Sequence, residues 1–330
     1  MERERLVRPG LWNGRGLSIF GDVYPPYVSA LAVSGSNLYA GGWFMTAGGN
    51  SANNVAKWNG SSWSALGSGI GSGFYGDSSK VSALAVAGNA LYAGGNFTAA
   101  GGNPANYIAK WDGTSWTNLS SGVGGYVYAL AVAGSNLYVG GQFMTAGGIA
   151  ATNIAKWGGS SWSPVGSQLS NSPQYGSPSV NALAVSGSNL YAGGTFTNAD
   201  GKLVNYIARW DGSNWNALGS GMNGNVAAFA ISGSELYVGG AFTTAGAKVS
   251  AYLAKAIVNP PMLAIQGDGF GGFFLNFSGV PGSAYRLQRA PTLNGPWATS
   301  SPQTAPASGW LQFWDVFPPP GQALYRSVGP

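Results

Sequence analysis

The chain contains no cysteine and no histidine among its 330 residues. Without cysteine it has no disulfide, no thiolate nucleophile and no cysteine-bound metal. Without histidine it also lacks the commonest general base and a usual ligand of transition metals. Nucleophilic catalysis by Ser/His or Cys/His arrangements is therefore excluded. We expect no cofactor and no metal centre.

Charged residues are also scarce, at 8% of the chain against about 25% in ordinary soluble domains. The formal net charge is +5, but the Lys and Arg residues are scattered and form no basic run interleaved with aromatics. We therefore expect no nucleic-acid partner. No apolar segment reaches the roughly 18 residues that a transmembrane helix needs.

The beginning of the chain, "MERERLVRPG", is charged and is not followed by the apolar region of a secretory signal. Either the protein is cytosolic, or this chain lacks its original leader. The low charge and the abundance of Gly, Ser and Asn favour the second reading. They indicate an extracellular or cell-surface protein.

What the sequence does contain is an internal repeat. The segment "VSALAVSGSNLYAGG" at 28–42 recurs from Val81, Val127, Val180 and Val226, at spacings of 53, 46, 53 and 46 residues. Periods of this size are typical of propeller blades. Within a unit, "VSALAV" alternates as a strand does, "GSN" predicts a tight turn into "LYAGG", and a second hairpin follows through "NGSS". Each unit is thus predicted to form four antiparallel strands.

The two ends of the repeat array complement each other. The fifth unit stops at "AYLAKA" (251–256), where its fourth strand is missing. At the other end, "LWNGRGLSIFG" (11–21) aligns without a gap to "KWNGSSWSALG" (57–67), which makes it an orphan fourth strand. If this strand pairs with the last unit, residues 11–256 close as a five-bladed β-propeller behind a ragged N-terminus at 1–10. The alternative is a fragment of a longer array.

The repeats resemble those of kelch and galactose-oxidase-like β-propellers of bacterial surface and secreted proteins. The resemblance lies in the second strand ending in Gly-Gly ("LYAGG", "LYVGG"), the third ending in "AKWDG" and the fourth opening with Trp ("SWTNL"). It covers 11–256 and implies a propeller that serves as a binding platform. The copper oxidases of that family use His and Cys residues absent here, so their chemistry is not implied.

After Pro260 and Pro261 the repeat gives way to longer strands separated by proline-containing turns. Residues 257–330 are predicted to form a small β-sandwich. The run "GVPGSAYRLQRAPTLNGPW", ending in "LYRSV", resembles fibronectin-III-like modules of secreted bacterial proteins. That resemblance implies a role as a spacer or attachment module.

Two regular features of the repeat are interpreted as structural. A cation precedes the aromatic residue of the third strand, and its stem is expected to cover the neighbouring blade while its charge stays in water. These cations are Lys57, Lys110, Lys156, Arg209 and Lys255. The tryptophan pairs around the following turn, such as Trp58 with Trp63 and Trp111 with Trp116, are expected to be core.

The carboxylates are poorly placed for catalysis, because glycosidases commonly need two converging carboxyl groups. Asp112 and Asp211 fall in equivalent hairpin turns at the periphery. A carbohydrate-active enzyme using Asp22, Asp77 or Asp200 at the propeller mouth is the alternative function. Asp200 in "NADGKL" and Asp268 in "GDGFGG" resemble calcium turns but lack the further oxygen ligands, so ordinary glycine turns are expected.

Variation within the repeat falls on one predicted face, which carries the links between blades and the loops after Gly-Gly. Loops on a rigid scaffold are the usual seat of recognition. We therefore predict a non-catalytic protein that binds a glycan or a protein through this face. A purely structural repeat array remains a further alternative. The predicted ligand-binding residues are Trp43, Tyr75, Asn96, Tyr126, Gln142 and Tyr175.

Overall fold

The computed structural model describes residues 26–71, 78–171 and 176–258 without interruption. Beyond these it describes shorter segments at 263–267, 273–278, 284–292, 295–300, 302–304, 310–315 and 324–328. The chain divides into two compact units. Unit 1 comprises Met1–Phe229 with Val238–Ala254, and unit 2 comprises Ala230–Tyr237 with Lys255–Pro330. All regular structure in the described residues is β, and none of them belongs to a helix that could cross a bilayer.

Five antiparallel sheets follow one another along the repeat, and each is a meander of consecutive long strands. Sheet 1 consists of β1 (Tyr27–Ser34), β2 (Asn37–Trp43), β5 (Val55–Trp58) and β6 (Trp63–Ala65). Sheet 2 consists of β8 (Lys80–Ala87), β9 (Ala90–Asn96), β12 (Ile108–Trp111) and β13 (Trp116–Asn118). Sheet 3 consists of β14 (Tyr126–Ala133), β15 (Asn136–Gln142), β18 (Ile154–Trp157) and β19 (Trp162–Pro164). Sheet 4 consists of β21 (Val180–Ser186), β22 (Asn189–Gly194), β25 (Ile207–Trp210) and β26 (Trp215–Ala217).

Sheet 5 has three strands, β27 (Val226–Ser232), β28 (Glu235–Gly240) and β31 (Leu253–Ile257). The sequence predicted four strands in each of the first four units and a missing fourth strand in the fifth. The first prediction is confirmed, and the described residues of the fifth unit form three strands of this sheet. The predicted closing strand at 11–21 and the predicted ragged terminus at 1–10 lie outside the described residues.

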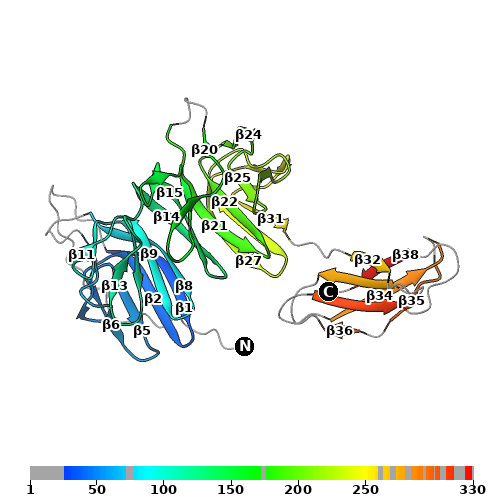
Figure 1. Ribbon diagram of the computed structural model, residues 1–330, viewed down its shortest axis with the longest axis horizontal. Helices are drawn as coiled ribbons and strands as arrows, with labels where there is room; N and C mark the ends of the chain where they lie inside the picture. Colours follow the sequence, from blue (N-terminus) through cyan, green and yellow to red (C-terminus); the bar gives the residue numbers. More distant parts are fainter. Residues whose placement is uncertain are drawn as a thin grey trace. The chain divides into compact units, whose positions relative to one another are not determined.

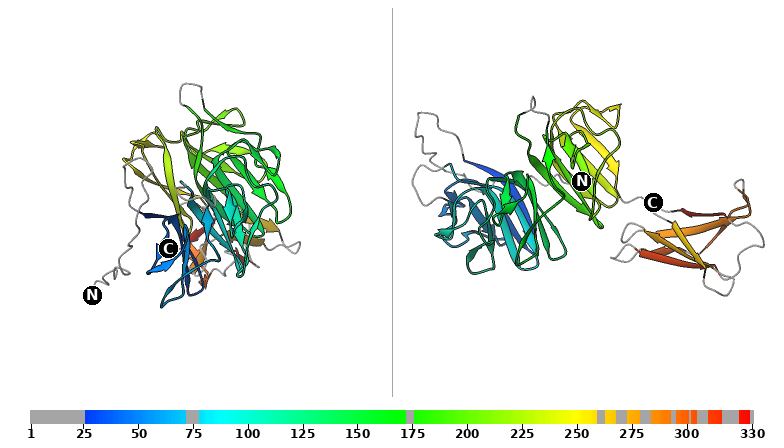
Figure 2. Two further views of the ribbon diagram at one scale, coloured as in Figure 1. Left: turned by 90° about the vertical axis from the view of Figure 1, so that its left-hand side faces the viewer. Right: turned by 45° about the horizontal axis from the view of Figure 1, so that its top comes forward.

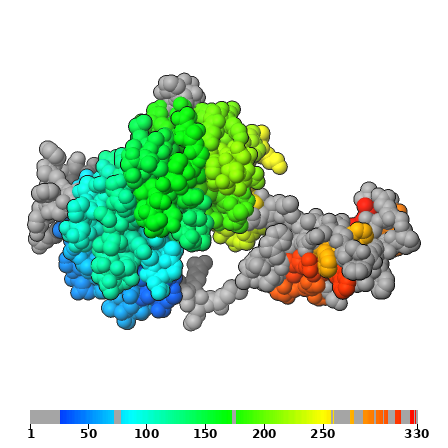
Figure 3. Space-filling view, in the orientation of Figure 1, coloured from blue at the N-terminus to red at the C-terminus, as the bar shows by residue number. Residues whose placement is uncertain are grey.

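Successive sheets pack face to face in the order of the sequence. Figure 1 shows β1, β8, β14 and β21, the first strands of sheets 1 to 4, one after another across unit 1. Figure 2 shows the same succession from two further sides. In the space-filling view of Figure 3 the sheets form adjoining blocks of colour from blue to green, so each repeat contacts its neighbour in sequence.

A short hairpin that the sequence reading missed lies between the second and third long strand of every sheet. These hairpins are β3 (Thr46–Ala47) with β4 (Asn50–Ser51), β10 (Ala99–Ala100) with β11 (Asn103–Pro104), β16 (Thr145–Ala146) with β17 (Ile149–Ala150), β23 (Asn198–Ala199) with β24 (Lys202–Leu203), and β29 (Thr244–Ala245) with β30 (Lys248–Val249). Two further short strands follow sheets 1 and 3 in the sequence, β7 (Ile70–Gly71) and β20 (Leu169–Ser170). They pair with the short hairpins of sheets 2 and 4. The hairpins lengthen the end of each sheet that carries the variable loops.

The predicted strict alternation along the first strand is wrong. A β-bulge interrupts the pairing of the first two strands in sheets 1 to 4, between Val81 and Ala83 in sheet 2 for example. A bulge adds one residue to one strand and shifts the side chains beyond it by one position. Val81 and Leu84, three residues apart, therefore both face Gly41 of the preceding sheet.

The two glycines at the end of the second strand are required for different reasons. A methyl group on Gly41 would lie 2.5 Å from Cγ1 of Val81, because the next sheet packs directly on this backbone. A methyl group on Gly42 would instead strike the carbonyl oxygen of Tyr27 at the bulge. The first glycine thus permits sheet–sheet packing, and the second permits the bulge.

Tryptophans of the fourth strands connect neighbouring sheets. The indole Nε1 of Trp116 donates to the carbonyl oxygen of Leu66 at 2.8 Å. Two equivalent bonds follow, from Trp162 to Leu119 at 2.9 Å and from Trp215 to Val165 at 3.1 Å. The acceptor lies three residues after the tryptophan of the preceding sheet in each case.

These fourth-strand tryptophans are also buried, and each ring lies 5.3–5.6 Å from the ring of its third-strand partner. The prediction that the tryptophan pairs belong to the core is confirmed for the fourth-strand tryptophans. Among their third-strand partners Trp157 is buried, whereas Trp58, Trp111 and Trp210 are half-buried and pack against the core clusters.

Unit 2 contains two further sheets. One consists of β32 (Leu263–Gly267), β33 (Phe273–Ser278) and β37 (Trp310–Asp315). In the other, β34 (Ala284–Ala290) pairs with β35 (Ala298–Thr299), β36 (Gln303–Thr304) and β38 (Leu324–Val328). Both sheets contribute to one buried cluster, formed by Leu275, Tyr285, Leu287, Leu311 and Phe313. The longer strands predicted for this region are present as β32, β33, β34, β37 and β38, and the short strands β35 and β36 were missed.

Asp315 is buried beside this cluster. It forms an ion pair with Arg289, and it accepts a hydrogen bond from the hydroxyl of Tyr325 at 2.9 Å. Burial, followed by the hydrogen bond to Asp315, raises the pKa of Tyr325 to about 12. A buried carboxylate is thus held by one cation and one hydroxyl group, the arrangement that such a charge requires.

Candidate functional site: a variable rim

In each sheet the start of the first strand lies beside the end of the second strand, at the end of the hairpin opposite its tight turn. At this end Tyr27 pairs with Trp43, Lys80 with Asn96, and Tyr126 with Gln142. Backbone hydrogen bonds bring together the equivalent residues Ser179 with Thr195 and Asn225 with Ala241. The residue skipped by the bulge, such as Tyr128, lies at the same end. We call these positions the variable rim: Tyr27, Ser29, Trp43, Lys80, Ser82, Asn96, Tyr126, Tyr128, Gln142, Ser179, Asn181, Thr195, Asn225, Ala227 and Ala241.

The rim positions of neighbouring sheets adjoin. In sheets 2 to 5 the valine next to the first rim residue packs on the first glycine of the Gly-Gly pair in the sheet before it, as Val180 does on Gly140. Equivalent ends of the sheets are therefore aligned. A direct contact follows in sheets 4 and 5, where Nδ2 of Asn181 donates to Oδ1 of Asn225 at 3.0 Å.

The most developed part of the rim is an aromatic cluster on sheet 3. The ring of Tyr126 lies 5.8 Å from Tyr107 in an edge-on arrangement and 6.4 Å from Tyr128. The hydroxyl of Tyr128 donates to Oε1 of Gln142 at 3.3 Å. Burial raises the pKa of Tyr128, and the neighbouring Tyr126 acts in the same direction. Tyr126 itself is 44% exposed, so an aromatic face with polar groups beside it is open to solvent.

The rim of sheet 4 is polar instead. The side chain of Ser179 bonds to Oδ1 of Asn181 at 2.8 Å and lies 3.1 Å from the hydroxyl of Thr195. Together with the bond to Asn225, this makes a continuous row of hydroxyl and amide groups across sheets 4 and 5. Ser179 is buried, whereas Asn181, Thr195 and Asn225 are half-buried, so the amides and the threonine hydroxyl are the donors and acceptors that a ligand could reach.

Sheets 1 and 2 carry the other predicted ligand-binding residues. Trp43 is half-buried, and its ring lies 6.2 Å from that of Tyr27. The amide nitrogen of Asn96 donates to the carbonyl oxygen of Ser78 at 3.4 Å. The structure thus places Trp43, Asn96 and Gln142 at equivalent positions of three successive sheets, with Tyr126 paired to Gln142. Tyr75 and Tyr175 lie outside the described residues.

Several residues of the rim, and Tyr107 beside it, were missed by sequence reasoning. Tyr107 contacts Tyr126 from a loop that was assigned to the repeated framework. Tyr128, Asn181 and Ser179 were assigned to strand interiors or links, because the bulge that turns Tyr128 and Asn181 to the rim has no sequence mark of its own. The variation of the position was the one signal available: it reads Ser, Ser, Tyr, Asn and Ala across the five repeats, which is nearly as variable as the position after Gly-Gly.

The described carboxylates of unit 1 hold local backbone structure. Asp112 accepts bonds from the backbone nitrogens of Thr114 and Ser115, at 2.8 Å each, as predicted for a turn residue. These bonds hold its pKa well below the usual range. Asp200 binds a link segment, accepting bonds from the nitrogens of Ser167 at 2.7 Å and Gln168 at 2.9 Å.

The remaining carboxylates of the alternative functions, Asp22, Asp77 and Asp268, lie outside the described residues. In the part of the chain that the structure describes, no three Asp or Glu residues gather as they would around a metal ion.

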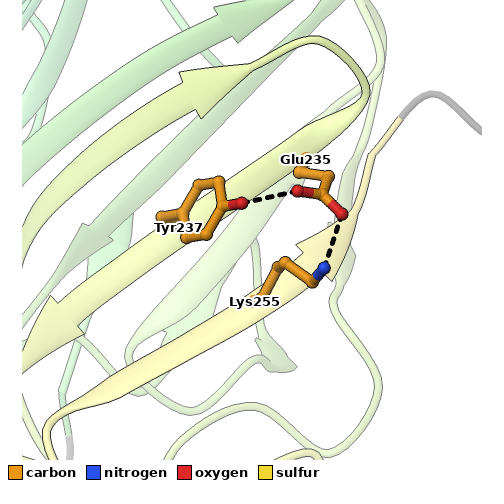
Figure 4. Close-up of polar contacts among 3 residues, drawn as sticks. All are labelled: Glu235, Tyr237 and Lys255. Atoms are coloured by element: carbon orange, nitrogen blue, oxygen red, sulfur yellow. Dashed lines mark hydrogen bonds and ion pairs between the residues drawn. The ribbon is translucent and has the colours of Figure 1, made fainter.

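The row of third-strand cations lies away from the rim. In sheets 1 to 4 each cation stands opposite a tyrosine of the second strand, as Lys110 does opposite Tyr92. In the last sheet Lys255 donates to Oε1 of Glu235 at 2.5 Å, and Tyr237 donates to Oε2 at 2.5 Å (Figure 4). The hydrogen bond from Lys255 is the largest cause that lowers the pKa of Glu235. The equivalent of Glu235 is Asn or Ala in the other four repeats, so this ion pair belongs to the last sheet.

Comparison with known proteins gives structural neighbours only. No protein-family model matches the chain, and no curated protein matches it significantly. Among solved structures, the computationally designed Ika4 protein is 19% identical with a TM-score of 0.35, over 56% of this chain and 95% of Ika4. The computationally designed Ika8 protein is 15% identical with a TM-score of 0.36, over 79% of this chain and 83% of Ika8.

Proposed function

We propose that this chain is a non-catalytic extracellular or cell-surface binding protein that recognises a glycan or a protein through the variable rim. One observation carries the proposal. The glycines, valines and tryptophans that hold the sheets together recur from repeat to repeat, whereas the residue after Gly-Gly differs in every one of five equivalent positions. A constant scaffold with variable side chains at one end is the arrangement expected of a recognition surface.

The scaffold proposed for this function is a five-bladed, kelch-like propeller closed by residues 11–21. Support comes from sheet 5, which has three strands, and from Val28, which is 40% exposed although its four equivalents are fully buried. The spacing of the tryptophan bonds adds a further argument. In a closed propeller the carbonyl of Phe20, three residues after Leu17, would be the equivalent acceptor for Trp63. Residues 17–20 would then stand as a fourth strand directly before sheet 1.

Hydrolysis of a carbohydrate at Asp22, Asp77 or Asp200 is the competing function. The contacts of Asp200 favour binding over hydrolysis, because one of its carboxylate oxygens accepts three hydrogen bonds from Ser167 and Gln168. A carboxylate that accepts three hydrogen bonds from the backbone and side chain of a link segment is a poor general acid or base. For residues 257–330 we propose a fibronectin-III-like spacer or attachment module.

A binding screen of the full chain tests the proposal. Soluble and insoluble polysaccharides would be offered to the wild type and to a Trp43→Ala, Tyr126→Ala, Gln142→Ala triple variant. A Ser36→Ala, Ser135→Ala variant is the matched control, because both serines are exposed in the tight turns at the opposite end. We expect the control to bind like the wild type and the triple variant, still folded by circular dichroism, to lose binding.

Equal binding by the triple variant would show that the rim is not the recognition surface. Release of new reducing ends from the bound glycan, abolished by Asp200→Asn, would instead establish the hydrolase.

A further inference from the structure

The fold repeats most closely every two sheets rather than every sheet. Sheets 1 and 3 are both followed by an additional short strand, β7 or β20, and each holds it with an asparagine in the left-handed region. Nδ2 of Asn54 donates to the carbonyl of Ile70 at 2.9 Å, and Nδ2 of Asn153 donates to that of Leu169 at 3.0 Å. In sheets 2 and 4 the same position is a tyrosine, and the short strand is reduced to a single bridge, between Val123 and Ala146 and between Met222 and Ala245.

This two-sheet period places aromatic groups on alternate sheets of the rim. Tyr27 and Tyr126 occupy the same position in sheets 1 and 3, and a second aromatic residue, Trp43 or Tyr128, lies 6.2 or 6.4 Å from it. The equivalent positions of sheet 2 are Lys80 and Asn96. An aromatic pair on sheet 1 and another on sheet 3 are thus separated by sheet 2, whose rim residues are polar.

The backbone at Tyr107 fixes the position of its ring at the second aromatic group. Its φ is 63°, a conformation that glycine and asparagine tolerate far better than a bulky aromatic residue. The equivalent residues Asn54, Asn153, Tyr206 and Tyr252 share it, with φ between 60° and 70°, so this backbone conformation belongs to the repeat. Here the strained backbone holds the ring edge-on against the exposed Tyr126.

The chemistry of the rim selects the ligand. None of its fifteen positions is a carboxylate, and Lys80 is its one cation. The rest are aromatic, hydroxyl, amide or methyl groups. A sugar ring presents an apolar face that packs on an aromatic ring and hydroxyl groups that bond to amides, so this set suits a neutral sugar.

We propose that the rim binds a linear neutral glycan at two aromatic subsites, one formed by Tyr27 and Trp43 and the other by Tyr107, Tyr126, Tyr128 and Gln142. The inference rests on the proposed function and narrows its ligand to a repeating polymer. A chain that reaches both subsites binds the second one intramolecularly, which raises its affinity without any new kind of contact. Affinity should therefore rise steeply with chain length once both subsites are spanned.

The test is calorimetric titration of the full chain with short and long oligomers of neutral β-glucan, α-glucan and mannan. Variants Trp43→Ala and Tyr126→Ala each remove one subsite, and Trp314→Ala removes an exposed aromatic residue of unit 2 as the control. We expect each rim variant to weaken binding of a long oligomer about ten-fold and to abolish the dependence on chain length. Tyr126→Phe keeps the ring and should retain most of the affinity.

The outcomes separate this inference from the proposed function. If one of these glycans binds with an affinity independent of length, or if only one of the two alanine variants weakens it, the two-subsite inference is wrong and the proposed function stands. If no glycan binds but a protein ligand is lost from both variants, the glycan assignment is wrong and recognition by the rim stands. If neither kind of ligand is found, both are wrong.

Discussion

Substitution of the first glycine of a Gly-Gly pair should force two sheets apart. In sheet 3, a methyl group on Gly140 would lie 2.5 Å from Cγ1 and 3.0 Å from Cβ of Val180 in sheet 4. Ordinary contacts of a Cβ atom begin near 3.4 Å. Gly140→Ala therefore requires the sheets or the valine to move by about 1 Å, which forfeits a quarter to a half of the dispersion energy across the contact.

The magnitude follows from two opposing effects. Overpacking of a dense core costs about 1–3 kcal/mol. Replacing glycine by alanine returns about 0.4–1 kcal/mol, because the unfolded chain loses conformational freedom and φ of Gly140 is not positive. The net expectation is a loss of about 1–2 kcal/mol in the free energy of unfolding. For a unit of this size that corresponds to a fall in Tm of roughly 2–8 °C.

Urea titration followed by tryptophan fluorescence measures the loss. Gly158→Ala is the control, because its methyl group would meet only the carbonyl oxygen of Ser161, at 3.8 Å, and it should change stability by less than about 0.5 kcal/mol. Val180→Ala removes the atom in conflict, so the double variant Gly140→Ala, Val180→Ala should lose less stability than the two single variants together. Strictly additive losses would refute this explanation of the Gly-Gly pair.

Further predictions concern other parts of the chain. Gly239→Ala should destabilise like the glycine variant above if the propeller closes and brings Val28 onto it; unchanged stability in the same titration would contradict closure. Trp215→Phe should lower the free energy of unfolding by about 2–4 kcal/mol, because it leaves the buried carbonyl of Val165 without its donor. A smaller loss than that caused by Trp210→Phe, at the half-buried tryptophan of the same sheet, would argue against the inter-sheet bond. Asp315→Asn should destabilise unit 2 by about 1–3 kcal/mol in urea, since its arginine partner loses the opposite charge. Because the pKa of Asp112 is lowered by folding, its stabilising effect is present at neutral pH and is lost as the pH falls below about 4; Asp112→Ala should therefore show a smaller acid-induced fall in Tm than the wild type.

Much of the sheet architecture could be predicted because strand and turn signals are local. The tight turns at 35–37 and 59–62 follow from Gly and Asn at fixed places, and the missing fourth strand follows from where "AYLAKA" ends. The role of the tryptophans was also accessible, since Trp63 and its equivalents are large, apolar and regularly spaced. The all-β class of the chain was therefore predictable, and the propeller within it stays a prediction.

The details that build the rim could not be predicted, because they depend on contacts between sheets. The bulge beside Val127 arises from pairing with the backbone at Gly141, and it alone turns Tyr128 toward Gln142. The strained backbone of Tyr107 is likewise set by bonds to its neighbours rather than by its own preference. The short hairpins were missed because two-residue strands carry too few residues to show a period.

Hydrogen–deuterium exchange of the full chain, with and without a glycan from the binding screen, tests recognition by the rim most directly. The proposal predicts slower exchange in peptides that contain the rim residues 126–128 and 142, with no change at the tight turn of the same sheet, 134–135. Protection at that turn, or in unit 2 alone, would contradict it.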